Sequence, residues 1–246
     1  MRPALHILLL ICAAAPAARA DSRNQTFDDF ATPLPVKPGE TLVVGIVGGW
    51  ERWDNPGRCI RRTAIAIKRR ELEGVWVETV ENHKLELAER LIREAFDFNR
   101  DGKLGEEEAK RARIVLFGQS LGGRAALRLA RTLNGWGVTV RLVAVVDAYG
   151  KDPYTVPPNV LAAANWFQRD HLFIKGAPLL RAEDPERTRI LFNRKVSYKG
   201  RRGEFEIDEQ SRLQTFFMGA HLVMEFDMPL WREVEKMVIE AALGRD

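Results

Sequence analysis

The chain contains little cysteine: only Cys12 and Cys59 occur among its 246 residues. Cys12 lies in an N-terminal segment that we expect to be removed, which leaves Cys59 as the one cysteine of the remaining chain. A single cysteine excludes an intramolecular disulfide, so a packed core must supply the stability even in an oxidising compartment. We expect Cys59 to be a half-buried helix residue; a reactive thiol in its arginine-rich surroundings is the alternative.

The chain also lacks a strong excess of charge of either sign. Its formal net charge is +4, and removing Arg2 and Arg19 with the N-terminal segment leaves 36 basic and 34 acidic residues. So mild a balance argues against nucleic acid as a partner. Hydrophobic residues make up 46% and charged residues 29% of the chain, which indicates a globular core rather than disorder. We find no internal repeat, and we expect a single domain over residues 41–246.

No apolar run is long enough to span a bilayer comfortably. The longest one extends from Leu5 to Ala15, follows Arg2 and precedes Ala18-Arg19-Ala20. A charged start, a short apolar middle and a small-x-small site are typical of a secretory signal peptide, here residues 1–20. An uncleaved membrane anchor is the alternative. We therefore expect a secreted or periplasmic protein without stable membrane insertion after cleavage, beginning with a polar, proline-rich extended lead-in at 21–40.

Apolar strands alternate with amphipathic helices, which predicts an α/β fold with a mostly parallel central sheet and helices on both faces. Short apolar runs indicate strands at 41–47, 75–80, 114–117, 138–146 and 160–167. Apolar residues at helical spacing indicate helices at 58–71, 83–96, 124–134 and 229–243. The span 171–215 is less regular, and its segments 189–192 and 195–198 can be interpreted as a hairpin.

The strand at 114–117 runs into the motif Gly118-Gln119-Ser120-Leu121-Gly122, which a helix-forming segment follows. A GxSxG sequence between a buried strand and a helix is typical of a nucleophile elbow, a tight turn that exposes the serine hydroxyl. Glycines are needed at 118 and 122 because side chains there would collide with the neighbouring strand and helix. We expect Ser120 to be a nucleophile; a tight turn without chemistry is the alternative.

A serine nucleophile needs a base, and the base needs an acid that holds its tautomer. After residue 20 the chain offers only His83, His171 and His221. His83 opens a helix and is expected at the surface, whereas His221 lies shortly before the final helix, where a loop can return to the sheet. We favour His221 over His171 as the base.

For the acid we favour Asp147, which ends the strand directly after the nucleophile helix. Active sites of α/β sheets lie at the carboxyl ends of the strands. A turn aspartate is the alternative role for Asp147. Asp170 is the reserve candidate, and Asp227 is expected to cap the last helix.

The GxSxG motif at 118–122 and the order Ser120, Asp147, His221 resemble the α/β-hydrolase superfamily. The resemblance implies an oxyanion hole built from the backbone N–H of Leu121 and an N–H of the Gly48-Gly49-Trp50 loop, with Gly49 and Trp50 as candidates. Asp147 departs from the family pattern, because most members place the acid further along the chain. The short segment after Asp147 leaves no room for a large cap domain.

Residues 97–108 match the EF-hand calcium loop, with oxygen-bearing side chains at positions 1, 3 and 5, glycine at 6 and glutamate at 12. The expected ligands are Asp97, Asn99, Asp101, the Lys103 carbonyl and Glu108. EF-hands normally occur in pairs, and here the exiting helix can extend only from Glu106 to Ala112. We expect one structural Ca²⁺ ion; an acidic loop that binds no metal is the alternative.

Together these features predict a secreted serine hydrolase that cleaves carboxylic esters through an acyl-enzyme, as lipases and esterases do. Its substrate would be a small-molecule or lipid ester in an open site, and catalysis would need no cofactor. Trp50, Trp53 and Tyr149 are candidates to line this site; a packing role for each of them is the alternative. Because the same triad chemistry cleaves thioesters and amides, the sequence leaves these two bond types open as substrates. The alternative function is not enzymatic: a calcium-stabilised binding or structural protein on a hydrolase scaffold. A peptidase of the same superfamily usually needs a larger cap than this chain can hold.

Overall fold

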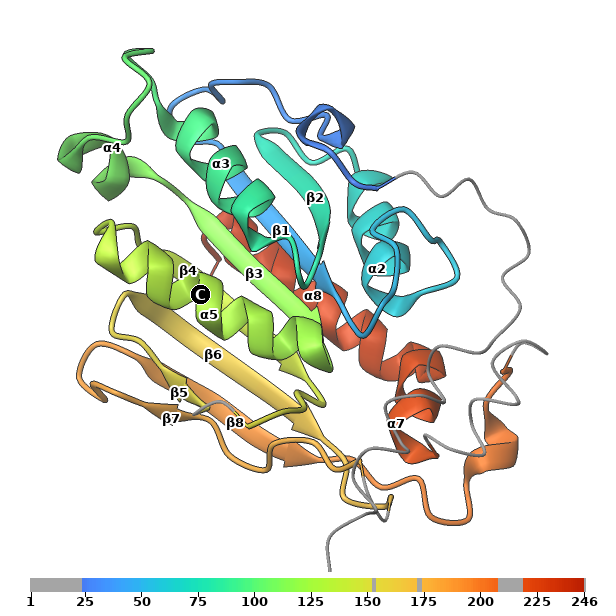
Figure 1. Ribbon diagram of the computed structural model, residues 1–246. Coiled ribbons are helices and arrows are strands. Elements are labelled where there is room, and N and C mark those ends of the chain that lie inside the picture. The colour runs from blue at the N-terminus through green and yellow to red at the C-terminus, as the bar shows by residue number, and fades with distance from the viewer. Residues whose placement is uncertain (1–23, 152–153, 172–173, 208–218, 246) are drawn as a thin grey trace, which may run out of the picture.

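The computed structural model describes residues 24–151, 154–171, 174–207 and 219–245 (Figure 1). The expected signal peptide at 1–20 lies outside the described residues. The helices of the described part are all too short or too polar to cross a membrane. Within the described part of the expected lead-in, residues 24–40, Phe27–Asp29 form the 3₁₀ helix η1, and the other residues of this part form no helix or strand.

A six-stranded sheet forms the centre of the molecule, and all its strand pairs are parallel. Its order is β2-β1-β3-β4-β6-β8. The strands are β1 (Thr41–Val47), β2 (Val75–Glu81), β3 (Ile114–Gln119), β4 (Val140–Val146), β6 (Val160–Phe167) and β8 (Arg189–Lys195). The short strands β5 (Thr155–Val156) and β7 (Arg181–Ala182) pair with each other beside it. The central strands β1 and β3 are buried along their whole length, as their apolar runs predict.

Helices cover both faces of this sheet (Figure 1). Side chains alternate along a strand, so β3 sends Ile114 and Leu116 to one face and Val115 and Phe117 to the other. The first face packs against α3 (Leu85–Phe96), α4 (Glu106–Arg111) and α5 (Leu121–Gly135). The second packs against α2 (Cys59–Lys68), the short α7 (Ala220–Val223) and α8 (Met228–Leu243). Two apolar cores therefore hold the sheet from opposite sides, and the predicted fold class is confirmed.

Most predicted elements coincide with observed ones, but the predicted hairpin at 189–198 is wrong. Residues 189–195 form the single strand β8, which pairs in parallel with β6. Asn193, a typical turn residue, lies inside this strand because its side chain accepts hydrogen bonds from Asn165 and from the backbone N–H of Leu180. It also donates to the Leu180 carbonyl. These side-chain hydrogen bonds replace the turn that the sequence suggested.

The carboxyl ends of all six strands lie along one edge of the sheet, because the strands run in the same direction. This edge carries the Gly48-Gly49-Trp50 loop after β1 and Ser120 after β3. Asp147 follows β4, and Gln168 follows β6. The residues that the sequence singled out on separate strands thus lie at the same edge, where α/β sheets bind ligands.

Candidate active site

Ser120 lies in a sharp turn between β3 and α5. Its backbone has φ 57° and ψ −124°, a conformation that side-chain-bearing residues rarely adopt. A Cβ atom at Gly118 would collide with the backbone of Gly122, and one at Gly122 would collide with the carbonyl oxygen of Ile46. The motif glycines therefore allow the strand, the turn and the helix to approach one another closely, as a nucleophile elbow requires.

The side chains of Ser120, His221 and Asp147 form a continuous chain of hydrogen-bonding atoms. The Oγ atom of Ser120 lies 2.8 Å from Nε2 of His221, and Nδ1 of His221 lies 2.6 Å from Oδ2 of Asp147. All three side chains are buried; Ser120 keeps 7% of its surface exposed and Asp147 none. In the tautomer with the proton on Nδ1, His221 donates to Asp147 and its Nε2 accepts from the Ser120 hydroxyl. The arrangement can thus remove a proton from Ser120.

Asp147 is held by a residue that sequence reasoning did not identify. The backbone N–H of Gln168 donates to Oδ1 of Asp147, and its side-chain amide donates to Oδ2, each at 2.9 Å. Gly176 also lies against this carboxylate, since a Cβ atom there would overlap Oδ1. The only available signal was the position of Gln168, directly after a predicted strand. These two hydrogen bonds fix the orientation of the Asp147 carboxylate, whose Oδ2 atom contacts His221.

The other candidate histidines and acids lie in different environments. His171 accepts a hydrogen bond from the backbone N–H of Ile174, which contributes to the turn after β6. His83 is half-exposed beside Glu81 at the end of β2. Asp170, the reserve acid, accepts from Ser197 and from the backbone N–H of Tyr198. The structure brings none of these three next to Ser120 among the contacts of the described residues.

Asp227 caps helix α8, as expected, by accepting a hydrogen bond from the backbone N–H of Leu230. It also accepts a 2.8 Å hydrogen bond from the buried hydroxyl of Tyr198. Burial and the neighbouring Asp227 carboxylate raise the pKa of Tyr198. This contact fixes the segment after β8 to the start of α8, shortly after His221.

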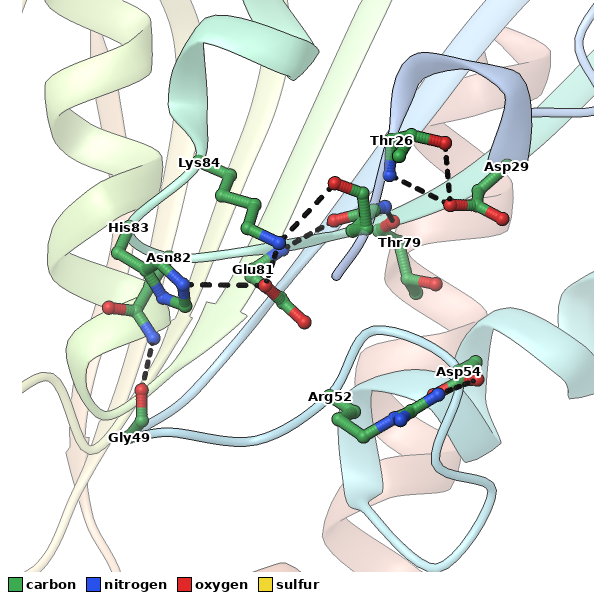
Figure 2. Close-up of polar contacts among 11 residues, drawn as sticks. Thr26, Asp29, Gly49, Arg52, Asp54, Thr79, Glu81, Asn82, His83 and Lys84 are labelled. Carbon is green, nitrogen blue, oxygen red and sulfur yellow. Dashed lines mark hydrogen bonds and ion pairs between the residues drawn. The ribbon is translucent and has the colours of Figure 1, made fainter. Parts of the chain in front are cut away.

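The Gly48-Gly49-Trp50 loop lies beside the elbow, because a Cβ atom at Gly48 would come within 3.2 Å of the Ser120 Cβ. Figure 2 shows how the end of β2 holds this loop: the side-chain amide of Asn82 donates to the carbonyl of Gly49. It also donates to the carbonyl of Val47 at 3.1 Å. Within the described residues, the backbone N–H groups of Gly49, Trp50 and Leu121 have no hydrogen-bond acceptor. These N–H groups remain available for an oxyanion.

The three aromatic residues expected to line the site differ in exposure. Trp50 is 78% exposed and stacks obliquely near the His83 ring, with 5.6 Å between ring centroids. Tyr149 is 38% exposed and lies 6.4 Å from the His221 ring. Trp53 is only 6% exposed, and the Arg52 guanidinium lies over its ring. The ring of Trp53 therefore offers less surface to a ligand than the other two, and its lining role stays a prediction.

Residues 97–105 join α3 to α4, and the expected calcium loop 97–108 includes the first three residues of α4. The Asp97 carboxylate accepts hydrogen bonds from the backbone N–H groups of Asp101 and Gly102. The Glu108 carboxylate accepts from those of Asn99 and Gly105. Across the described residues, no three His, Cys, Asp or Glu side chains group as a metal site. This statement covers only those four residue types, whereas two of the expected calcium ligands are an amide side chain, Asn99, and a backbone carbonyl, that of Lys103. Calcium binding therefore stays a prediction.

Cys59 is the first residue of α2 and is completely buried. Burial raises the pKa of its thiol well above the ordinary value, and the charges of Glu225 and Glu51 raise it further. A buried neutral thiol is a poor nucleophile. Cys59 is therefore a core residue, more deeply buried than we expected.

Comparisons with known proteins give similar folds only. No family model matches the chain, and no curated protein matches it significantly. A protein from Xanthomonas campestris pv. campestris assigned as a hydrolase of the alpha/beta superfamily is 16% identical over 82% of this chain and 99% of its own, with a TM-score of 0.36.

Two further solved structures are similar to the same extent. The RedJ thioesterase of prodiginine biosynthesis from Streptomyces coelicolor is 12% identical over 86% of this chain and 93% of its own, with a TM-score of 0.38. A cutinase-like protein from Cryptococcus sp. is 14% identical over 84% of this chain and 94% of its own, with a TM-score of 0.32. Likenesses this distant carry no functional argument. The fold class rests on the parallel sheet, its strand order and the helices on both faces.

Proposed function

We propose that the protein is a serine hydrolase that cleaves carboxylic esters through an acyl-enzyme intermediate. The observation that carries this proposal is the continuous path from the Ser120 Oγ atom through the His221 ring to Asp147, with distances of 2.8 and 2.6 Å. A serine hydroxyl becomes a nucleophile only when a base removes its proton. Here the base, the acid and the nucleophile come from separate strands and loops that meet at one edge.

The reaction proceeds in two halves. Ser120 Oγ attacks the ester carbonyl carbon while Nε2 of His221 takes the hydroxyl proton, and the carbonyl oxygen becomes an oxyanion. The C–O bond to the alcohol then breaks, and His221 returns the proton to the leaving alcohol. Water repeats the sequence on the acyl-enzyme: His221 takes a water proton, and Ser120 leaves with it as a free hydroxyl. Asp147 stays ionised and stabilises the imidazolium in both halves.

The oxyanion would accept hydrogen bonds from the backbone N–H of Leu121 and from that of Gly49 or Trp50. Leu121 begins helix α5, so the positive end of the helix dipole also faces the developing charge. Such donors stabilise a charge that exists only in the transition state, and losing one typically costs about 10²- to 10³-fold in kcat. The free N–H groups at this edge support the proposal.

The exposed aromatic rings support an accessible ester as the substrate. Trp50 and Tyr149 offer apolar surface on the two sides of the elbow, after β1 and after β4. Between β4 and β6, the described residues form the two-residue strand β5 and no helix, so this part of the connection holds no helical lid. A site of this kind suits a small or surface-exposed ester better than an enclosed one. Export by a cleaved signal peptide at 1–20 remains part of this proposal.

A screen of p-nitrophenyl esters of increasing acyl length tests the proposed function. The wild-type protein should hydrolyse at least the short-chain members with saturation kinetics, and Ser120→Ala should abolish turnover above the uncatalysed rate. Thioester and amide substrates with the same acyl group separate the three bond types. A folded wild-type protein that cleaves none of them would contradict the proposal and favour a non-catalytic binding protein.

A further inference from the structure

A side-chain amide from a neighbouring strand holds two backbone carbonyls around the Gly48-Gly49-Trp50 loop. Asn82 directly follows β2, which pairs with β1 on the side away from β3. Its Nδ2 atom donates to the carbonyl of Val47, the last residue of β1, at 3.1 Å. It also donates to the carbonyl of Gly49, as Figure 2 shows. Both hydrogens of the amide are therefore used on this one loop.

These two contacts set the direction of the N–H groups that follow the held carbonyls. The peptide bonds of the loop are trans, since the only cis bond of the described residues precedes Pro35. In a trans peptide, the C=O of one residue and the N–H of the next point in opposite directions. Asn82 lies on the β2 side of the loop, so the N–H groups of Gly48 and Trp50 point away from β2. On that other side of β1 lies β3, which ends next to Ser120.

The Gly48 N–H shows this direction within the same loop. It follows the Val47 carbonyl, and it donates to the Glu51 carboxyl at 3.3 Å. That carboxyl lies 3.9 Å from the Nε atom of Arg58, whose guanidinium pairs with Glu225 at 3.0 Å. Glu225 comes four residues after the proposed base. An N–H opposite a carbonyl held by the β2 amide thus reaches the side of the molecule that carries the base.

The Trp50 N–H is the second group of this kind, because it follows the Gly49 carbonyl. Within the described residues it has no hydrogen-bond acceptor. The loop lies against the elbow, since a Cβ atom at Gly48 would come within 3.2 Å of the Ser120 Cβ. The Gly49 N–H differs: it belongs to a peptide whose carbonyl, that of Gly48, accepts from the Glu51 N–H, so its direction depends on this turn.

We propose that Asn82 is a positioning residue for the oxyanion hole: its amide orients the Gly49–Trp50 peptide so that the Trp50 N–H faces the substrate oxygen at Ser120. The two donors of the hole are then the N–H groups of Trp50 and Leu121. Donors that are held in place before the reaction stabilise the oxyanion without a cost of reorganisation. This role rests on the proposed function, because it needs a substrate oxygen that becomes negatively charged.

The first test is the steady-state hydrolysis of a short-chain p-nitrophenyl ester by Asn82→Ala. The substitution removes both hydrogen bonds to the loop and adds no charge near the oxyanion. We expect kcat to fall by about 10- to 100-fold with little change in KM, because a misplaced oxyanion donor affects the transition state more than ground-state binding.

The matched control is Asn159→Ala. The amide of Asn159 also donates to two backbone carbonyls, those of Ala130 and Val138. It lies directly before β6, at the amino edge of the sheet and therefore at the opposite edge from Ser120. This variant should also lose stability, yet keep kcat within a few-fold of the wild type. An equal kcat in the two alanine variants would overturn the positioning role.

The second test uses a trifluoromethyl ketone with the same acyl chain as a transition-state analogue. Ser120 Oγ adds to the ketone carbon, the hydroxyl proton moves to His221, and the ketone oxygen becomes an oxyanion in the hole. The inhibition constant should rise in Asn82→Ala by about the factor by which kcat/KM falls, and stay unchanged in Asn159→Ala. An inhibition constant unchanged in Asn82→Ala would contradict the role of Asn82, because the loss of kcat would then arise elsewhere.

The third test identifies the donor itself. Replacing Trp50 by its α-hydroxy analogue exchanges the backbone N–H for an ester oxygen and keeps the side chain. We expect this exchange to lower kcat by about 10²- to 10³-fold, as the loss of an oxyanion donor does. The same exchange at Gly49 provides the comparison, and a larger loss there would overturn the assignment of the Trp50 N–H.

These measurements separate the failure of the two proposals. A folded wild type that hydrolyses no ester would overturn the proposed function and the positioning role with it. An active wild type in which Asn82→Ala lowers kcat no more than Asn159→Ala would overturn the positioning role and leave the proposed function intact.

Discussion

The Nδ1 atom of His221 lies 2.6 Å from Oδ2 of Asp147, although 74 positions separate the two residues in the chain. Asp147 follows β4, and His221 lies in the short helix α7, so the contact depends on the return of the chain to the carboxyl edge of the sheet. Asp147 adopts φ 48° there, an uncommon value for a residue with a side chain. Such backbone conformations cost energy and cluster at functional sites.

Replacing His221 distinguishes the two candidate bases. We expect His221→Ala to lower kcat by at least about 10³-fold, because Ser120 then lacks a group to take its proton. His171→Ala is the matched control, since it removes the acceptor of one turn hydrogen bond and should leave kcat within a few-fold of the wild type. Steady-state hydrolysis of a p-nitrophenyl ester measures both. Retained activity in His221→Ala would exclude His221 as the base.

Gln168→Leu tests the support of Asp147. The variant loses the amide that donates to Oδ2 but keeps the backbone donor to Oδ1, so we expect kcat to fall by about 10-fold with KM nearly unchanged. Gln168→Glu removes the same donor and adds a second carboxylate, and its loss should be larger because the two like charges repel. Equal activity in Gln168→Leu and wild type would show that the backbone hydrogen bond alone orients Asp147.

Tyr198→Phe tests the contact that fixes the chain near His221. The substitution removes the 2.8 Å hydrogen bond to Asp227 and leaves a buried carboxylate oxygen with one donor fewer. We expect a loss of roughly 1 to 3 kcal/mol in the free energy of unfolding, measured by urea denaturation, because a buried acceptor that loses its donor costs about this much. An exposed tyrosine, Tyr149, serves as the matched control: Tyr149→Phe should leave the unfolding free energy unchanged. Equal stability of Tyr198→Phe and wild type would argue against the contact.

Calcium binding by residues 97–108 can be decided by thermal unfolding. If the loop binds with a dissociation constant near 10⁻⁴ M, about 10 mM Ca²⁺ should stabilise the fold by roughly 2.7 kcal/mol and raise the Tm relative to protein in chelator. Glu108→Gln removes the expected bidentate ligand and should abolish the shift, whereas Glu107→Gln, its exposed neighbour, should retain it. Identical midpoints with calcium and chelator would remove the metal site from the account.

The sequence predicted the features that depend on local patterns. The strand at 41–47 follows from its apolar run. Helical periodicity predicts helices at 83–96 and 229–243, which are observed at 85–96 and 228–243. The cap at Asp227 follows from its position before a helix. The elbow was predictable because Gly118 and Gly122 are sterically required by the close approach of strand, turn and helix. The order of the strands in the sheet could not be predicted, since it depends on packing between distant segments.

The features that the sequence did not predict depend on side-chain partners. Asn193 lies inside a strand because its amide bonds Asn165 and Leu180, a contact invisible in a local window. Gln168 supports Asp147 only because β6 lies next to β4. Trp53 is buried although it lies in a loop, and Arg58 forms an ion pair with Glu225, which lies near the other end of the chain. Each of these contacts follows from tertiary structure rather than from residue type.

The account depends most on Ser120 being an activated nucleophile. Incubation with a fluorophosphonate probe, followed by intact mass and peptide mapping, measures this directly, because the probe forms a covalent bond with an activated serine. We predict one probe per wild-type chain, located on Ser120, and none on folded Ser120→Ala. Folded wild-type protein that stays unlabelled, or a label on a different residue, would contradict the account.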